Sequence, residues 1–381
     1  MKKIAIVTAT RAEYGILKPL ICRLEQEKEF EVQLYVTGTH LSKRYGNTKQ
    51  EIEADGIRIY KEIPILEEGN MPYAISATMA NALRGFAKAF MEDLPDLLVV
   101  LGDRTEILGI CCAAMNENIP IAHLHGGELT EGAVDDCVRH AITKMSYLHF
   151  PAAEVYRKRI IQMGEDPKRV INAGALGVEN ILHVPLYDRR TVEKELGIAK
   201  DQAYVIVTFH PVTLERQQAG EQTRELLAAI EEESQYHYLI TKPNADAGAG
   251  EINRMLEIFA KEHKHVQITA SLGMLRYLSA VRYSAFVLGN SSSGIIEAPA
   301  LGVPTVNIGN RQMGRLMADT IINCGNEKDE IVQAMKKAAA TEHKKSALYG
   351  DGHTSEIITE TIKTVSYTHL DVYKRQGKRN L

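Results

Sequence analysis

Cysteine is scarce in this sequence, and no CxxC spacing occurs. The five cysteines stand mostly inside apolar helical patterns, which is typical of reduced core residues; they are Cys22, Cys111, Cys112, Cys137 and Cys324. This usage argues against a disulfide framework and against zinc ligands. We therefore expect a cytoplasmic protein without a metal site.

Long apolar runs and an excess of one charge are also lacking. No stretch has the apolar length of a membrane span, and the first apolar run, residues 4–8, has only strand length and no cleavage site after it. The 45 basic and 49 acidic residues are interspersed and give a net charge of −4. This balance argues against nucleic acid and membrane surfaces as partners.

A GxGxxG fingerprint is missing where a dinucleotide-binding protein would carry it. The first predicted strand ends instead in TATRAEY, and Arg11 follows at the turn into a helix. The sequence therefore argues against NAD as a cofactor. At that turn the Arg11 guanidinium could bind a phosphate or a nearby carboxylate. A purely structural pair with Glu13 is the alternative.

What the chain does have is a regular alternation of strands and helices. The first half predicts strands at residues 4–8, 30–37, 97–101, 119–122 and 147–150, with helices at 12–26, 73–90, 135–144 and 153–163. The second half predicts strands at residues 204–209, 236–241, 265–269, 285–288 and 305–308. This alternation predicts α/β architecture with mostly parallel, doubly wound sheets.

A chain of 381 residues exceeds one ordinary core, so we expect two domains. The run 168–183 has the turn composition of a crossing point between them. We expect an N-terminal domain over 1–172, a C-terminal domain over 173–352, and a disordered or artefactual tail over 366–381. Two such halves imply a cleft between domains, a favoured place for small molecules.

Reactive side chains gather after two central strands of the first half. GDR follows residues 97–101 and HLHGGE follows residues 119–122, so both segments fall at the carboxyl ends of strands, where α/β sheets bind ligands. The polar residues there, or on the next helix, are Asp103, His123, His125, Glu128, Asp135, Asp136, Arg139 and His140. Any one of them could be a helix cap or a surface charge, but a group of eight indicates a site.

The second half carries a pattern suited to a diphosphate. After residues 285–288 comes GNSSSG, followed by a predicted helix that begins near Ile295. Hydroxyl groups and backbone N–H groups at such a start bind anions. Glu297 could accept hydrogen bonds from a ribose, and Arg311 could add a cation. A serine N-cap with an incidental glutamate is the alternative.

Two further polar residues follow strands of the second half. His210 stands at the tip of residues 204–209, before a rigid proline, where it could donate to a phosphate or act as an acid or base. Asn244 follows residues 236–241 and could meet a hydroxyl group or a base edge. The alternatives are a histidine that merely ends the strand and an asparagine that forms a turn.

Taken together, these motifs resemble those of the hydrolysing UDP-N-acetylglucosamine 2-epimerases, within the UDP-N-acetylglucosamine 2-epimerase family. The resemblance runs from residue 1 to about 365 and keeps its order through TATRAEY, GDR, HLHGGE, DDxxRHAITK, FHPVT, PNADAG, GNSSSGIIE and NIGxRQxGR. It implies two Rossmann-like domains in the GT-B arrangement with the active site in the cleft. It also implies a final helix over about 353–365 that returns to the first domain, no added cofactor, and a homodimer or homotetramer.

The resemblance also assigns roles to residues of this chain. Its UDP-binding positions are Arg11, Arg104, His210, Asn244, Ser291, Ser292, Glu297 and Arg311, and its candidate catalytic positions are Asp103, His125, Glu128, Asp135 and His210. Non-hydrolysing members carry a glutamate, in a motif like HxEAG, where this chain has His125. The base that removes the C2 proton is therefore His125, Glu128 or Asp135.

The implied activity converts UDP-GlcNAc and water to N-acetylmannosamine and UDP, as in sialic acid biosynthesis. UDP leaves from C1 as the C2 proton is removed, and water adds to the resulting 2-acetamidoglucal. Alternatives within the family are a hydrolysing epimerase of a UDP- or GDP-linked diacetamido-trideoxyhexose, on a legionaminic acid route, and a non-hydrolysing epimerase. Outside it, the alternatives are a GT-B glycosyltransferase and a regulator that binds a nucleotide sugar without turnover.

Overall fold

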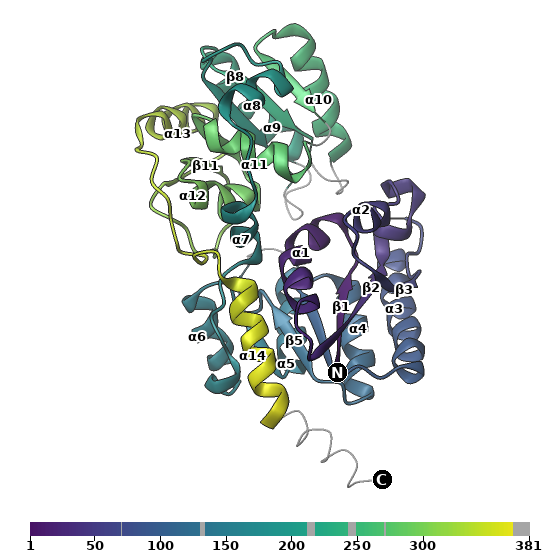
Figure 1. Ribbon diagram of the computed structural model, residues 1–381. Helices are drawn as coiled ribbons and strands as arrows, with labels where there is room; N and C mark the ends of the chain where they lie inside the picture. The colour runs from purple at the N-terminus through teal and green to yellow at the C-terminus, as the bar shows by residue number, and fades with distance from the viewer. Residues whose placement is uncertain (70, 130–133, 212–217, 243–248, 270–271, 369–381) are drawn as a thin grey trace. The chain divides into compact units, whose positions relative to one another are not determined.

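The computed structural model describes residues 1–69, 71–129, 134–211, 218–242, 249–269 and 272–368. By the density of contacts the chain divides into two units (Figure 1). Unit 1 comprises Met1–Glu128, Val134–Asn180 and Gly350–Leu381, and unit 2 comprises Leu129–Ala133 and Ile181–Tyr349. The boundary thus falls after Asn180 rather than at residue 172.

Unit 1 is built on a six-stranded parallel sheet with the order β3-β2-β1-β4-β5-β6. Its strands are β1 (Lys2–Thr8), β2 (Phe30–Thr37), β3 (Ile59–Ile63), β4 (Leu97–Leu101), β5 (Ile121–Leu124) and β6 (Leu148–Phe150). The central β4 is buried along its whole length. A continuous apolar run is what a parallel strand covered on both faces requires.

Helices cover both faces of this sheet. They are α1 (Arg11–Glu25), α2 (Lys49–Ala54), α3 (Pro72–Glu92), α4 (Thr105–Asn116), α5 (Asp135–Met145), α6 (Glu154–Gln162) and α14 (Thr354–Thr368). On one face Ile4 and Val99 share a core cluster with Leu17 of α1 and Ile358 of α14. On the other face Val100 packs with α3 and α4. The sheet is therefore the middle layer of an αβα sandwich.

Unit 2 repeats this plan with a second six-stranded parallel sheet, in the order β12-β11-β10-β7-β8-β9. Its strands are β7 (Tyr204–Thr208), β8 (His237–Thr241), β9 (Val266–Thr269), β10 (Phe286–Gly289), β11 (Thr305–Ile308) and β12 (Ile321–Cys324). Its helices are α8 (Arg189–Leu196), α9 (Ala219–Glu232), α10 (Ala249–Glu262), α11 (Gly273–Tyr283), α12 (Glu297–Leu301) and α13 (Lys328–Ala340). They form two core clusters, one on each face.

The connection between the units differs from the predicted turn. The predicted turn over residues 168–183 is instead the end of a 3₁₀ turn, Pro167–Arg169, followed by helix α7 (Leu176–His183), which crosses the unit boundary. Near the end of the chain, α14 packs against α1 in unit 1 (Figure 1). This helix runs through Thr368, so its backbone includes the first residues of the predicted tail. Residues 369–381 lie outside the described part of the chain.

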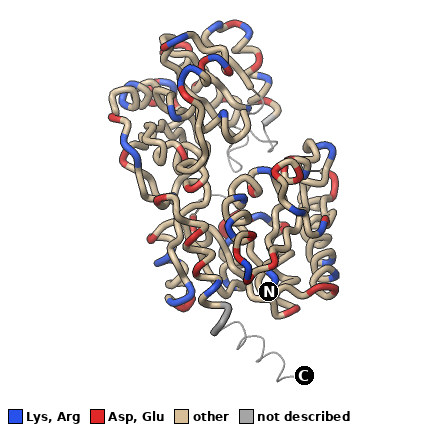
Figure 2. Tube along the Cα trace, in the orientation of Figure 1, with Lys and Arg blue, Asp and Glu red and all other residues tan. Residues whose placement is uncertain are grey.

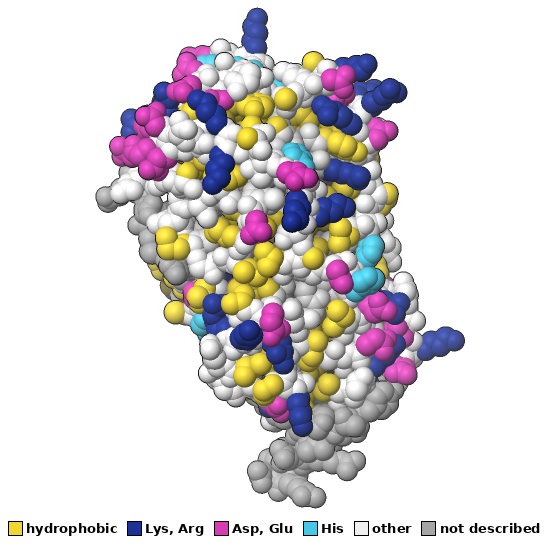
Figure 3. All heavy atoms as spheres, turned by 90° about the vertical axis from the view of Figure 1, so that its left-hand side faces the viewer, with side chains coloured by type: hydrophobic (Ala, Val, Ile, Leu, Met, Phe, Trp, Pro, Cys, Tyr) yellow, Lys and Arg dark blue, Asp and Glu magenta, His cyan; other side chains and the backbone are white. Residues whose placement is uncertain are grey.

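The distribution of charge agrees with the balanced composition. Basic and acidic residues are interspersed along the chain trace (Figure 2). The face drawn in Figure 3 likewise mixes both signs with apolar side chains. Among the residues that the structure describes, no helix combines the length and the apolar character that a membrane crossing needs.

Candidate active site

The strand order of each sheet creates a switch point where ligands bind in such folds. In unit 1 the neighbours β1 and β4 lead in opposite directions along the sheet, and in unit 2 the same holds for β7 and β10. When the loops after two adjacent strands lead to opposite sides, a crevice forms between them at the carboxyl ends of the strands. Arg11 and Arg104 follow β1 and β4, whereas His210 and Ser291 follow β7 and β10.

The two arginines of the unit 1 switch point are held by carboxylates of the same unit. Nε of Arg11 lies 2.9 Å from the Glu51 carboxylate. Nε of Arg104 lies 2.6 Å from Oε1 of Glu106. Glu13 instead forms a capping box with Thr10 and accepts from the N–H groups of Ala9 and Thr10. The alternative Arg11–Glu13 pair is therefore wrong.

The loop after β5 takes a conformation that its sequence explains. His125 has φ of +62°, which is uncommon for a residue with a side chain, and its N–H donates to the carbonyl of Phe150 on β6 at 3.0 Å. A Cβ atom on Gly127, where φ is +76°, would lie 2.6 Å from the carbonyl oxygen of Tyr156. Glycine is therefore required there, and the turn directs His125 and Glu128 toward each other.

His125 and Glu128 form a hydrogen-bonded dyad. Nδ1 of His125 lies 3.1 Å from Oε1 of Glu128, and both side chains are largely buried. Because a carboxylate accepts hydrogen bonds, Nδ1 carries the proton. In the neutral ring Nε2 then holds the lone pair. This atom is buried and has no hydrogen-bond partner among the described residues. A histidine oriented in this way by a carboxylate is suited to accept a proton from a substrate.

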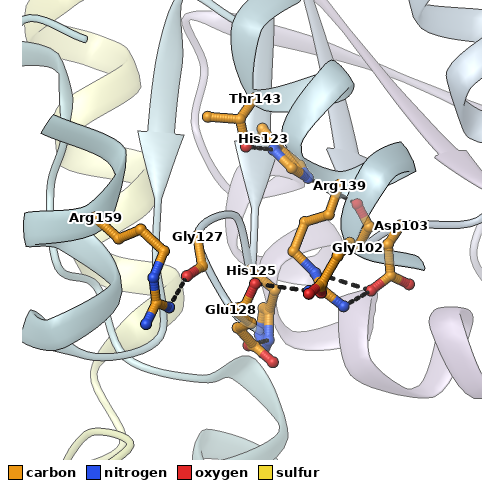
Figure 4. A network of polar contacts seen from close by, with 10 residues as sticks. Gly102, Asp103, His123, His125, Gly127, Glu128, Arg139, Thr143 and Arg159 are labelled. Carbon is orange, nitrogen blue, oxygen red and sulfur yellow. Dashed lines mark hydrogen bonds and ion pairs between the residues drawn. The ribbon is translucent and has the colours of Figure 1, made fainter. Parts of the chain in front are cut away.

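Arg139 connects the loops that follow β4 and β5 with helix α5 (Figure 4). Its Nε donates to Oδ2 of Asp103 at 2.9 Å, and Nη2 donates to the same oxygen. Its Nη1 donates to the Glu128 carbonyl at 2.7 Å and to Asp136 at 2.5 Å. Only 1% of this side chain is exposed. Arg139 therefore holds Asp103 and the backbone of the dyad in one arrangement.

Arg139 was one of the eight clustered polar residues but not one of the predicted site residues. Its i, i+3 spacing from Asp136 on α5 reads as an ordinary helical ion pair. The sequence did not indicate that α5 covers this edge of the sheet and directs the Arg139 side chain inward. Asp135 begins α5 and is exposed. Its side chain therefore stands at the surface rather than among the buried bonds of Arg139.

His123, also among the eight, is structural. It is fully buried, its Nε2 donates to the Gly102 carbonyl at 2.7 Å, and its Nδ1 accepts from Thr143 at 3.2 Å. Burial lowers the pKa of His123 to about 3, so the ring is neutral. The bond to Gly102 ties the loop of Asp103 to the neighbouring strand.

In unit 2, His210 is buried and Arg311 lies close to it. Burial and the Arg311 charge lower the pKa of His210 to about 4, so the ring is neutral near pH 7. A neutral imidazole can donate one hydrogen bond to a phosphate, and Arg311 can supply the cation. Asn244, predicted to join them, lies outside the described residues.

The prediction of a helix after the GNSSSG segment is wrong about where that helix begins and how long it is. Ser291 caps a 3₁₀ turn over Ser292–Gly294, and α12 begins only at Glu297 and has five residues. Pro299 has no N–H group to close the α-turn back to Ile295, which accounts for the break. Ser291 and Ser292 therefore offer the N–H and hydroxyl groups of a tight turn, and Glu297 stands in the first turn of α12.

The buried histidines of unit 1 make its stability depend on pH. Burial lowers the pKa of His123 and His149 to about 3 and that of His40 to about 4. Below pH 6.5 the unfolded chain binds protons at these rings that the folded unit does not. Glu13 opposes this trend, because burial raises its pKa to about 7 and the folded unit binds its proton first.

On unfolding in this pH range, the three histidines bind about three protons and Glu13 releases about one. The chain therefore takes up about two protons. We expect the free energy of unfolding of unit 1 to fall by about 2–3 kcal/mol per pH unit between pH 6 and 5. Urea unfolding followed by circular dichroism at pH 7, 6 and 5 measures this slope. A free energy that stays constant over that range would contradict the prediction.

Comparison with known proteins identifies the family of this chain. The family model described as UDP-N-acetylglucosamine 2-epimerase matches residues 22–363. The chain belongs to this family. A Polysialic acid biosynthesis protein P7 of Escherichia coli is 41% identical over 88% of this chain and 85% of its own length. The GDP/UDP-N,N'-diacetylbacillosamine 2-epimerase (hydrolyzing) of Campylobacter jejuni is 38% identical over 91% of this chain and 89% of its own.

The fold of the family is also recognisable in solved structures. The UDP-GlcNAc 2-epimerase of Neisseria meningitidis, crystallised with UDP-GlcNAc, matches with a TM-score of 0.82 and 17% identity. The match covers 96% of this chain and all of that one. The predicted fold class, α/β with two Rossmann-like doubly wound domains as in GT-B proteins, is confirmed.

Proposed function

We propose that this family member is a hydrolysing 2-epimerase of a UDP-linked 2-acetamido sugar, with UDP-GlcNAc as the first candidate substrate. The observation that carries the proposal is the His125–Glu128 dyad beside Asp103. Inversion at C2 needs a group that removes a weakly acidic proton, and the buried Nε2 of His125 fits that role. The name of the Campylobacter jejuni relative, which specifies a hydrolysing epimerase, supports the hydrolytic outcome.

The proposed reaction proceeds in two balanced stages. In the first, Nε2 of His125 takes the proton from C2, the C1–O bond breaks, and UDP leaves with the bonding pair to give 2-acetamidoglucal. The Glu128 carboxylate stabilises the imidazolium that forms. In the second, the oxygen of water bonds to C1 while a carboxyl group protonates C2 from the other face. The proton that water loses passes to the carboxylate left by that transfer, and His125 releases its proton to solvent. Asp103 and Asp135 are the candidates for that acid.

Unit 2 is proposed to bind the leaving UDP. Negative charge accumulates on the diphosphate as the C1–O bond breaks. His210, Arg311 and the turn of Ser291 and Ser292 supply hydrogen-bond donors and a cation at the switch point of unit 2. Glu297 is the proposed partner of the ribose hydroxyls. Arg11 and Arg104, at the switch point of unit 1, and Asn244 complete the proposed UDP-binding set.

The second candidate substrate is a UDP- or GDP-linked diacetamido-trideoxyhexose. The name of the Campylobacter jejuni relative favours this substrate, whereas the name of P7 points to polysialic acid biosynthesis. All of these substrates share the acetamido group at C2 and the diphosphate at C1. They differ at C4 and C6, so the same acid–base groups serve each of them.

Proton NMR of the protein with UDP-GlcNAc in D₂O tests the proposal. We expect release of UDP and of N-acetylmannosamine that carries deuterium at C2. Unchanged UDP-GlcNAc, with turnover of a UDP-linked diacetamido sugar in a parallel sample, would assign the second candidate. Accumulation of UDP-N-acetylmannosamine would contradict hydrolysis and identify a non-hydrolysing epimerase.

A further inference from the structure

Asn290 lies at the centre of the unit 2 switch point, and sequence reasoning did not single it out. It follows β10 directly, and 1% of the residue is exposed. Its backbone N–H donates to the Thr208 carbonyl of β7 at 3.1 Å. The last residue of β10, Gly289, has φ of +136°, and a Cβ atom there would lie 2.0 Å from that same carbonyl. Glycine therefore allows the close approach that places Asn290 beside the tip of β7.

The side chain of Asn290 clamps the backbone of His210 on both sides. The His210 N–H donates to Oδ1 of Asn290 at 2.7 Å, and Nδ2 of Asn290 donates to the His210 carbonyl at 2.8 Å. Because one bond needs an acceptor and the other a donor, only an amide satisfies both. The two bonds fix the direction in which His210 projects its ring.

The carbonyl of Asn290 binds two side chains from the loop after β11. Nη1 of Arg311 donates to it at 3.0 Å, and Nε2 of Gln312 donates at 2.9 Å. One residue thus joins the ends of three strands. Nδ1 of His210 is buried and has no hydrogen-bond partner among the described residues. The bonds from Asn290 therefore position a ring whose Nδ1 is available to a ligand.

We propose that Asn290 is a positioning residue, which presents His210 and Arg311 as one preformed pair of donors to the diphosphate of the nucleotide sugar. This inference rests on the proposed function, because it takes the diphosphate as the ligand of unit 2. Preorganisation of the two donors removes the free-energy cost of ordering them when the ligand binds. Asn290 itself acts through its two partners.

The neutrality of Asn290 is part of this role. Among the described residues, Arg311 is the charged group that acts on His210. An aspartate at position 290 would keep the bond from the His210 N–H, but its second oxygen would face the His210 carbonyl and repel it. Its charge would also favour protonation of the His210 ring.

The variants N290D and N290S test the proposal in the full chain. We expect N290D to raise the pKa of His210 by at least one unit, measured from the pH dependence of its ring signals in ¹H–¹³C NMR, with assignment from the spectrum of H210Q. We expect each variant to weaken UDP binding about tenfold or more in calorimetry. N323D is the control, since it makes the same charge change on β12 and keeps the bond from Nδ2 of Asn307.

A double-mutant comparison separates positioning from general stability. If Asn290 acts through His210, N290S will weaken UDP binding much less in an H210Q background than in the wild type. Equal losses in both backgrounds would overturn the proposal, as would a wild-type His210 titration in N290D. The titration of His210 needs no nucleotide. If the wild-type protein fails to bind UDP, the proposed function is refuted, but the effect of Asn290 on the pKa of His210 can still be measured.

Discussion

Replacement of Glu128 by glutamine is expected to lower the turnover number by about 10³-fold, within the range of general acid–base catalysis. A glutamine at this position can still accept the hydrogen bond from Nδ1 of His125, so the geometry of the dyad is retained. It cannot stabilise an imidazolium ring as a carboxylate does. The measurement is the steady-state rate of UDP release at saturating substrate, together with circular dichroism to show that the fold is intact.

Unit 1 offers a matched control for this variant. Glu165 lies 3.3 Å from Nε2 of the buried His149, so a second glutamate stands beside a histidine, here without a hydrogen bond to that nitrogen. It follows α6, whose carboxyl end lies at the opposite edge of the sheet from the catalytic loops. E165Q is expected to keep turnover within about twofold of the wild type. Wild-type turnover in E128Q would remove Glu128 from the mechanism, and the same criterion applies to D103N for Asp103.

Replacement of Arg139 by methionine is expected to destabilise unit 1 by about 3 kcal/mol and to reduce turnover at least 100-fold. The buried guanidinium makes bonds to Asp103, Asp136 and the Glu128 carbonyl, and its removal leaves those acceptors without their donor. We take the lower end of the range for broken buried pairs because 29% of the Asp103 side chain is exposed. Urea unfolding and turnover measured on the same sample give both quantities.

Arg157 of α6 provides the comparison for Arg139. It also donates to a carbonyl, that of Val170, and to a carboxylate, that of Glu154, but 30% of its side chain is exposed. R157M is expected to change the free energy of unfolding by about 1 kcal/mol and to leave turnover unchanged. Equal losses of turnover in the two variants would show that Arg139 has no special role in the site.

Sequence patterns located the buried central strands and two of the four edge strands, β6 and β9. The continuous apolar run of β4 predicted its bounds because both faces of this strand are covered. The edge strands β3 and β12 were missed. Their sequences, IYKEI and IINC, mix polar with apolar residues, and both strands are partly exposed. In such strands, tertiary contacts outweigh local preference.

Within the site, the residue types and the edge of the sheet could be predicted, but the pairing could not. Arg11 bonds to Glu51, which is far away in sequence, because α2 lies next to the turn after β1. The roles of Arg139 and Asn290 come from hydrogen bonds across several elements, and no spacing along the chain encodes them. His123 shows the converse, since a histidine in a polar motif proved to be a neutral core residue.

The packing of α14 on α1 has a consequence for the synthesis of the protein on the ribosome. Ile358 and Ile362 of α14 are buried in the core cluster of unit 1, although most of unit 2 is translated between α7 and α14. The domain that emerges first therefore exposes part of its apolar core until the last helix leaves the exit tunnel. Unit 2 can close its own core earlier, so the nascent chain completes its domains in the reverse of their order of translation.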